Sequence, residues 1–138
     1  MTMKHSVFAK LSFCGLVAAA LIVGAAPAAF AASDVVKEYD KDADNTLDLA
    51  EVKAAASAEF DKLNKDSDDT LDRAETKGVV KGKDFKAADP DKDGTLTKAE
   101  YLTIAESLFK KADVDNDGTL EAKEFHSKAG RALKKLID

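Results

Sequence analysis

The sequence predicts an all-α fold, a compact helical bundle in which single short helices join four acidic loops. Three observations favour this fold class. The 138-residue chain contains four acidic twelve-residue segments, which start at positions 40, 64, 89 and 113. Only 12 or 13 residues separate one segment from the next. At a rise of about 1.5 Å per residue each connection spans roughly 18 to 20 Å, which is room for one helix. Apolar residues also recur at helical spacing in these connections and in the C-terminal segment.

Residues 1–31 have the layout of a secretory signal peptide. They contain no acidic residue and run from a basic start through an apolar stretch to Ala29 and Ala31, the two small residues that a signal peptidase reads. We expect cleavage after Ala31, which removes the only cysteine, Cys14, and leaves the mature protein in the periplasm. A membrane anchor is the alternative. It is disfavoured because glycine and alanine dilute the apolar stretch, which is shorter than the ~20 strongly apolar residues of a spanning helix.

The predicted mature domain, residues 32–138, is acidic and has few large apolar side chains. Its 107 residues include 26 acidic and 19 basic ones, a net charge of −7, and neither cysteine nor methionine. Disulfides and thiol chemistry are therefore excluded, and the acidic balance does not favour a nucleic-acid binder. A chain of this size without tryptophan buries little apolar surface, so we expect another source of stability.

The four acidic segments repeat one pattern. Each has oxygen-bearing side chains at positions 1, 3 and 5, threonine at 7, leucine at 8 and glutamate at 12. This is the calcium-loop pattern of the EF hand, and four copies at regular intervals exclude a chance match. We number them loops one to four: residues 40–51 (DKDADNTLDLAE), 64–75 (NKDSDDTLDRAE), 89–100 (DPDKDGTLTKAE) and 113–124 (DVDNDGTLEAKE).

This spacing suits a hard cation, which takes about six to eight oxygen ligands. Alternate residues turn their side chains inward, the backbone carbonyl at position 7 adds an oxygen, and the glutamate at position 12 adds two. The candidate metal ligands are Asp40, Asp42, Asp44, Thr46, Asp48, Glu51, Asn64, Asp66, Asp68, Thr70, Asp72, Glu75, Asp89, Asp91, Asp93, Thr95, Thr97, Glu100, Asp113, Asp115, Asp117, Thr119, Glu121 and Glu124.

The sharp turn at position 6 requires φ > 0, which glycine adopts most easily. Gly94 and Gly118 meet this requirement in loops three and four. Asn45 and Asp69 are the next most tolerant types, so we expect some strain in loops one and two. The leucines at position 8 are predicted core residues that let the loops pair through a short β-bridge: Leu47, Leu71, Leu96 and Leu120.

Helices are predicted over residues 52–63 and 101–112. Each has a phenylalanine, Phe60 or Phe109, four residues before the following loop. An apolar stripe at this spacing is typical of a core-facing surface rather than of a cofactor site.

The other two segments are less regular. Residues 76–88 contain Gly78 and Gly82, each costing ~1 kcal/mol in a helix interior, which predicts a broken helix or a hinge between two halves. Residues 125–138 carry apolar and basic side chains on opposite faces, which predicts an amphipathic helix that closes the core.

Taken together, these residues resemble the lanmodulin family of periplasmic lanthanide-binding EF-hand proteins. The resemblance rests on the signal peptide, the 24- to 25-residue loop spacing, and residues 60–63 (FDKL), 75–78 (ETKG) and 89–96 (DPDKDGTL). It covers essentially the whole mature chain. The resemblance implies a compact helical fold with peripheral loops ordered by trivalent lanthanides, and a role in metal uptake or trafficking linked to lanthanide-dependent alcohol oxidation. The chain departs from the family at position 2, where many members have proline in most loops and this chain has Lys41, Lys65, Pro90 and Val114.

Two other functional classes are disfavoured. The mature chain has no Ser/His/Asp or Cys/His set, and its only histidine is His126, so we predict no enzyme activity. It has no methionine, so the Met-rich groove of a calmodulin-like sensor is not expected. A carrier or buffer of lanthanide or calcium ions remains, as does a structural domain held folded by calcium. The predicted chain is a monomer whose partners are metal ions and a periplasmic delivery partner that the sequence does not identify.

Charge and loop composition give three further expectations. The four loops together carry −13 and the rest of the mature chain +6, so the metal-free chain should be largely disordered. Loop two should be the weakest site, because Asn64 is neutral and Asp69 occupies the turn position. Loops one and four should favour trivalent lanthanides over Ca²⁺, because Asp48 and Glu121 at position 9 add a fifth carboxylate.

Overall fold

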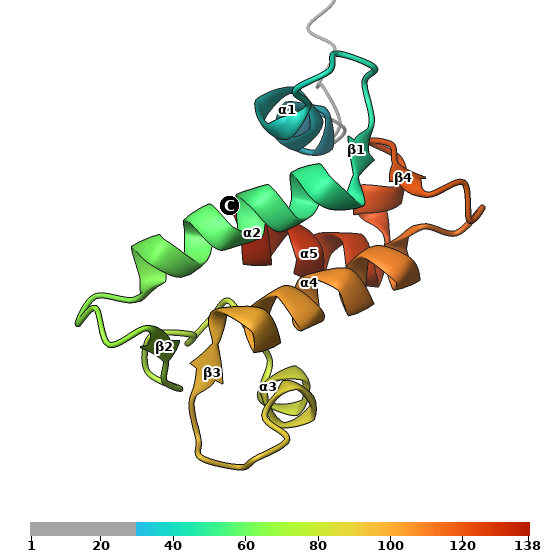
Figure 1. The fold of residues 1–138 in the computed structure, drawn as a ribbon. Helices are drawn as coiled ribbons and strands as arrows, with labels where there is room; N and C mark the ends of the chain where they lie inside the picture. The colour runs from blue at the N-terminus through green and yellow to red at the C-terminus, as the bar shows by residue number, and fades with distance from the viewer. Residues whose placement is uncertain (1–29) are drawn as a thin grey trace, which may run out of the picture.

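A computed structural model describes residues 30–138, and this part of the chain is largely helical (Figure 1). The elements are α1 (Phe30–Tyr39), β1 (Leu47–Asp48), α2 (Leu49–Leu63), β2 (Thr70–Leu71), α3 (Gly82–Ala88), β3 (Leu96–Thr97), α4 (Lys98–Ala112), β4 (Thr119–Leu120), the 3₁₀ turn η1 (Glu124–His126) and α5 (Lys128–Ile137). The predicted all-α class is confirmed, since the strands are only two residues long. The signal-peptide prediction concerns residues 1–31, of which 1–29 lie outside the described range. None of the helices within residues 30–138 has the length and hydropathy that a membrane span requires.

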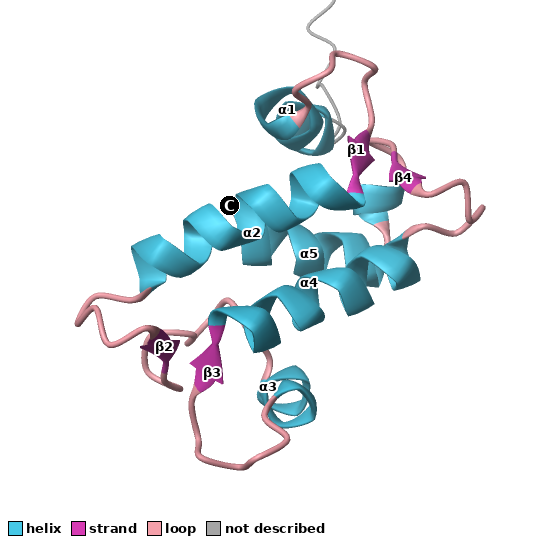
Figure 2. Ribbon diagram, in the orientation of Figure 1, coloured by secondary structure: helices cyan, strands magenta, loops and turns pink. Residues whose placement is uncertain are grey.

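The short strands pair the loops in an order that differs from the sequence order. β1 of loop one pairs antiparallel with β4 of loop four, and β2 of loop two pairs with β3 of loop three. The leucines at position 8 face each other in these bridges, Leu47 opposite Leu120 and Leu71 opposite Leu96, and all four are fully buried. The two bridges lie at opposite ends of α2 and α4 (Figure 2). The expected role of the leucines is therefore confirmed.

Helices α2 and α4 connect the two pairs of loops, and both begin with a capping box. Asp48 and Glu51 exchange side-chain-to-backbone hydrogen bonds at the start of α2, and Thr97 and Glu100 do so at the start of α4. Such reciprocal bonds satisfy the free N–H groups of a first helical turn. Each helix thus begins at position 10 of one loop, and position 1 of the next loop is its C-cap.

The core lies where α2, α4 and α5 pack together. The predicted core residues Phe60 and Phe109 are both buried, and the Phe60 ring meets the Tyr101 ring edge to face at 5.8 Å between centroids. Two tyrosine hydroxyls hold the C-terminal end of α5. Tyr39 donates to the Ile137 carbonyl oxygen at 2.7 Å and Tyr101 to that of Leu136 at 2.8 Å, which satisfies carbonyls that a helix end leaves free.

The connection between loops two and three is broken, as predicted from its glycines. Residues 73–79 form turns in which Gly78 has φ +90°, and of residues 76–88 only Gly82–Ala88 are helical, as α3. A left-handed residue cannot continue an α-helix without strain, so the helix starts after it.

The C-terminal segment is helical in two pieces rather than one. Ser127 separates η1 from α5 and caps the latter, since its Oγ accepts a hydrogen bond from Gly130 N at 2.8 Å. Gly130 packs so closely on loop four that a Cβ there would overlap the Glu124 carbonyl oxygen. His126 is exposed and lies in η1.

Candidate metal centres

Three of the four loops bring acidic side chains together in the described structure. In each of these loops, three carboxylates place one oxygen within 4.8 Å of the others. The clusters are Asp40, Asp42 and Glu51 in loop one; Asp89, Asp91 and Asp93 in loop three; and Asp113, Asp115 and Glu124 in loop four. Loop two forms no such carboxylate cluster within residues 30–138, and its position 1 residue is the neutral Asn64.

In loops three and four, the side chain at position 1 fits a bound cation. Asp89 and Asp113 are both more than nine-tenths buried, and the Oδ1 atom of each accepts no hydrogen bond within the described residues. Their Oδ2 atoms accept from Gly94 N at 3.2 Å and Gly118 N at 3.1 Å, across the loop. A buried carboxylate oxygen without a donor is costly, and a metal ion at the cluster would remove that cost.

Loops one and two differ at the same position. Both carboxylate oxygens of Asp40 accept hydrogen bonds, Oδ1 from Ala43 N at 2.6 Å and Oδ2 from Asn45 N at 2.8 Å. In loop two, the Oδ1 atom of Asn64 is buried without a donor, as in loops three and four, but it carries no charge.

The aspartates at position 5 accept hydrogen bonds from the threonine two residues later. In each loop, the aspartate Oδ1 atom accepts from both the backbone N and the Oγ1 of that threonine at 2.6–2.9 Å. These bonds lower the pKa of Asp68, Asp93 and Asp117 below the ordinary value. The threonines at position 7 thus orient an acidic ligand in addition to offering their own carbonyl.

At position 3, the pKa values of Asp42 and Asp91 shift in the opposite direction. Desolvation, followed by the neighbouring charge of Asp44, raises the pKa of Asp42, and desolvation with the nearby Asp89 and Asp93 raises that of Asp91. For Asp40, desolvation is outweighed by backbone N–H donors, chiefly that of Asn45, and the pKa is lowered. Crowded carboxylates with opposing pKa shifts are expected where like charges share a site made for a cation.

The glutamate at position 12 ties the start of each loop to its end, except in loop three. Glu124 accepts from Val114 N at position 2 and from Glu121 N at position 9, both at 3.0 Å. Glu51 and Glu75 make the same two contacts in loops one and two.

Loop three cannot make the first of these contacts because Pro90, at position 2, has no N–H group. Glu100 Oε2 keeps the position 9 contact, accepting from Thr97 N at 2.8 Å, and also accepts from Thr97 Oγ1 at 2.8 Å. Accordingly, within residues 30–138 Glu100 does not belong to the carboxylate cluster of loop three. Glu51 and Glu124 do belong to the clusters of loops one and four.

The side chains at position 9 lie outside the three clusters. Asp48 and Thr97 are the N-caps of α2 and α4, and Asp72 Oδ1 accepts from Ala74 N and Glu75 N. Glu121 makes an ion pair with Lys123 at 3.0 Å. The carboxylates of Asp48 and Glu121, which we expected to be additional metal ligands, therefore make contacts within the protein in this structure.

Backbone strain is more widespread than the sequence indicated. The predicted positive φ at position 6 is confirmed in all four loops, including Asn45 at 67° and Asp69 at 68°. Position 4 is also left-handed, in Ala43, Ser67, Lys92 and Asn116, with φ between 58° and 62°. The sequence gives no signal for this, since only Asn116 is of a type that favours the conformation.

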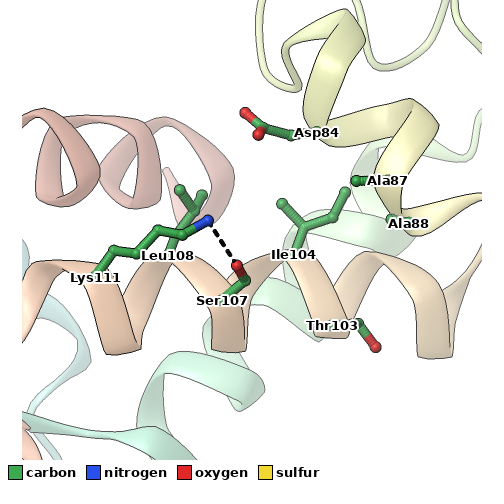
Figure 3. Close-up of a pocket in the computed structure, with 8 residues that line it drawn as sticks. All are labelled: Asp84, Ala87, Ala88, Thr103, Ile104, Ser107, Leu108 and Lys111. Atoms are coloured by element: carbon green, nitrogen blue, oxygen red, sulfur yellow. Dashed lines mark hydrogen bonds between the residues drawn. The ribbon is translucent and has the colours of Figure 1, made fainter.

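A separate hollow of about 130 Å³ lies between α3 and α4 (Figure 3). Ile104 and Leu108 line it together with Ala87 and Ala88, and the single carboxylate, Asp84, lies at its edge. Lys111 donates to Ser107 Oγ at 2.9 Å beside it. One carboxylate among apolar side chains does not suit a hard cation, and within residues 30–138 the acidic clusters all lie in the loops.

Comparison with known families agrees with this geometry. The family model of the EF hand matches residues 83–105 and 104–127, which contain loops three and four with their flanking helices. No curated protein is similar enough to be matched to the chain. Loops one and two differ from the matched loops at position 6, where Asn45 and Asp69 replace glycine. The chain thus carries two EF-hand metal-binding motifs and two further loops with the same acidic pattern.

Proposed function

We propose that this protein is an exported, lanmodulin-like EF-hand protein that folds around lanthanide(III) ions and serves in their uptake, buffering or trafficking. The ions are its cargo, and no catalytic step is assigned to it. The observation that carries metal binding is the pair of buried position 1 oxygens, Asp89 Oδ1 and Asp113 Oδ1. Neither has a donor within the described residues, and each belongs to a cluster of three carboxylates.

Charge is the argument for a trivalent ion. The attraction of each carboxylate for a cation grows in proportion to the ionic charge, whereas the loss of hydration grows with its square. A trivalent ion therefore needs more carboxylates than Ca²⁺ does. Loops one and four have five carboxylates at ligand positions, and loops two and three have four. Asp48 Oδ1 accepts the N-cap hydrogen bond and Glu121 Oε2 pairs with Lys123, so each carboxylate keeps its second oxygen for a metal ion.

Calcium is the second candidate, and the position 9 contacts favour it. In calcium-binding EF hands position 9 often coordinates through a water molecule. Asp48 as an N-cap and Glu121 paired with Lys123 are compatible with that arrangement and leave the nearest ligands to positions 1, 3, 5, 7 and 12. A calcium buffer or a calcium-stabilised structural protein would result.

A pair of substitutions that keeps side-chain size but removes charge separates the two candidates. Asp48→Asn with Glu121→Gln removes both position 9 charges, and Asn keeps the capping ability of Asp. The variant and the parent are compared in competition titrations at buffered free metal. If the cargo is a lanthanide, the substitutions lower the ratio of La³⁺ to Ca²⁺ affinity. The fold-decrease in this ratio exceeds the fold-decrease in Ca²⁺ affinity. The control is Asp34→Asn with Glu38→Gln, which removes the same charge from α1. If the position 9 variant keeps the ratio of the parent protein, the result supports the calcium-binding function instead.

A further inference from the structure

A basic hollow lies on the side of the molecule formed by α5 and the turn that follows loop two. Its volume is about 370 Å³. The turn contributes Gly78, Val79, Val80 and Lys81, and α5 contributes Lys128, Arg131, Ala132 and Lys135. Residues 128, 131 and 135 are spaced so that their side chains share one face of the helix. Two short elements far apart in sequence thus build one basic groove, which we call the α5 groove.

The charges of the α5 groove are not neutralised by the protein. Four cationic side chains line it, and no carboxylate does. Within residues 30–138, none of Lys81, Lys128, Arg131 and Lys135 makes an ion pair, although eight ion pairs form elsewhere in that range. The chain as a whole has more acidic than basic residues, so this groove is a local concentration of positive charge. Its charge is complementary to that of an anionic partner.

The concave shape and the apolar floor of the groove indicate which kind of anionic partner it fits. Val79, Val80 and Ala132 are partly buried and contribute apolar surface between the cations. A concave surface does not fit a flat bilayer, and an apolar floor gains nothing from a free inorganic anion. An extended peptide segment with acidic and apolar side chains satisfies both features.

The turn side of the groove is attached directly to a metal loop. Thr76 follows Glu75, the position 12 residue of loop two, and is almost fully buried. Its carbonyl accepts from Val79 N at 3.1 Å and Val80 N at 3.0 Å, and its Oγ1 donates to the Asp72 carbonyl at 2.8 Å. Fixing Glu75 on a metal ion therefore fixes the turn that forms one wall of the groove.

From these features we propose that the α5 groove docks an acidic peptide segment of a partner protein, and that it does so only when loop two holds a metal ion. The metal dependence rests on the proposed function. Metal loading also offsets the −13 charge of the loops, which otherwise repels an acidic partner. The partner would thus distinguish the loaded from the empty protein.

The test is fluorescence anisotropy with a fluorescein-labelled hexapeptide of sequence EDLEDL and the full mature chain. The chain is loaded with Ca²⁺, which the peptide chelates weakly, and compared with the chain in excess chelator. Binding should be at least about tenfold tighter to the loaded chain and should weaken as salt is raised. Arg131→Gln with Lys135→Gln should lower the affinity about tenfold. Lys37→Gln with Lys86→Gln removes the same charge outside the groove and should change the affinity less than about twofold.

Circular dichroism of the same samples separates the two proposals. If the chain gains helix with metal but the groove variant and the control bind the peptide alike, the groove proposal is wrong and metal binding stands. If the loaded and chelated chains bind the peptide equally, the metal dependence is wrong. If the parent instead binds phosphatidylglycerol vesicles and not the peptide, the groove recognises a membrane and this proposal fails. A chain that shows no response to metal contradicts the proposed function and, with it, the metal dependence of the groove.

Discussion

Leu47 in loop one lies directly opposite Leu120 in loop four, although 73 positions separate them in the chain. The bridge they form joins the first and last metal loops, and the equivalent bridge between Leu71 and Leu96 joins the middle two. Loops that share a bridge also share a backbone that must be ordered for either to bind. We therefore expect metal binding to be coupled within two pairs of loops. Loop one is coupled to loop four, and loop two to loop three.

Disabling loop four should accordingly weaken loop one more than loops two and three. Asp113→Asn with Glu124→Gln removes two members of the loop four cluster. The backbone amides of Asn45, Asp69 and Gly94 report on loops one to three in a Ca²⁺ titration followed by nitrogen-15 NMR. The equivalent variant of loop three, Asp89→Asn with Glu100→Gln, is the control and should weaken loop two. Equal weakening of the remaining loops would contradict the pairing.

Restoring a charge at position 1 of loop two should strengthen that loop. Asn64→Asp places a carboxylate where a buried amide oxygen now lies without a donor in the described structure. We expect the loop two affinity to rise about tenfold, or about 1.4 kcal/mol, with a smaller gain in loop three through their shared bridge. The amides of Asp69 and Gly94 provide the readout, and Asn45 should not respond. No gain at Asp69 would show that loop two is not limited by its missing charge.

Gly130 should not tolerate a larger residue. A Cβ at this position would overlap the Glu124 carbonyl oxygen, so Gly130→Ala must separate α5 from loop four. We expect a loss of about 1–3 kcal/mol in the free energy of unfolding of the metal-loaded protein. Gly82→Ala is the control, because no atom lies within 4 Å of a Cβ there, and it should stabilise the protein slightly. Thermal unfolding of both variants in saturating metal tests this, and similar melting temperatures would contradict the packing.

The ion pairs of Glu106 should make a small, pH-dependent contribution to stability. Hydrogen bonds from Lys110 at 2.7 Å and Lys53 at 3.0 Å lower the pKa of Glu106 from its ordinary 4.5 to about 2. Because the folded-state pKa is depressed, the stabilisation is complete above pH 4.5 and is lost as the pH falls toward 2. The melting temperature of Glu106→Gln should therefore lie below that of the parent at pH 6, and the gap should narrow between pH 4.5 and 3.5 in saturating metal. Asp34→Asn, which affects no ion pair in residues 30–138, is the control, and a gap that is constant with pH would refute this role.

The helices and the core could be predicted from the sequence because their signals are local. Phe60 and Phe109 lie at helical spacing before their loops, and the glycines of residues 76–88 interrupt that spacing. The fourfold acidic pattern identified the loops for the same reason. Loops three and four match the EF-hand family, and three of the loops form carboxylate clusters within the described range.

Features that depend on tertiary contacts could not be predicted in this way. Identical threonine and leucine pairs occur in all four loops, so the sequence cannot specify that loop one pairs with loop four. The role of Asp48 is likewise ambiguous in sequence. An aspartate at this position fits the pattern of a metal ligand and also that of a helix N-cap. Gly130 appears in sequence as a weak helical residue, and only its contact with Glu124 explains it.

We predict that metal binding supplies the folding free energy of this chain. The most direct measurement is far-UV circular dichroism of residues 32–138, titrated separately with La³⁺ and with Ca²⁺ at buffered free concentrations from an initial state in excess chelator. We expect little helix in chelator, a cooperative gain of helix with either ion, and a midpoint at lower free concentration for La³⁺. Full helicity in excess chelator would contradict the claim, because the loops would then close on their −13 charge without a cation.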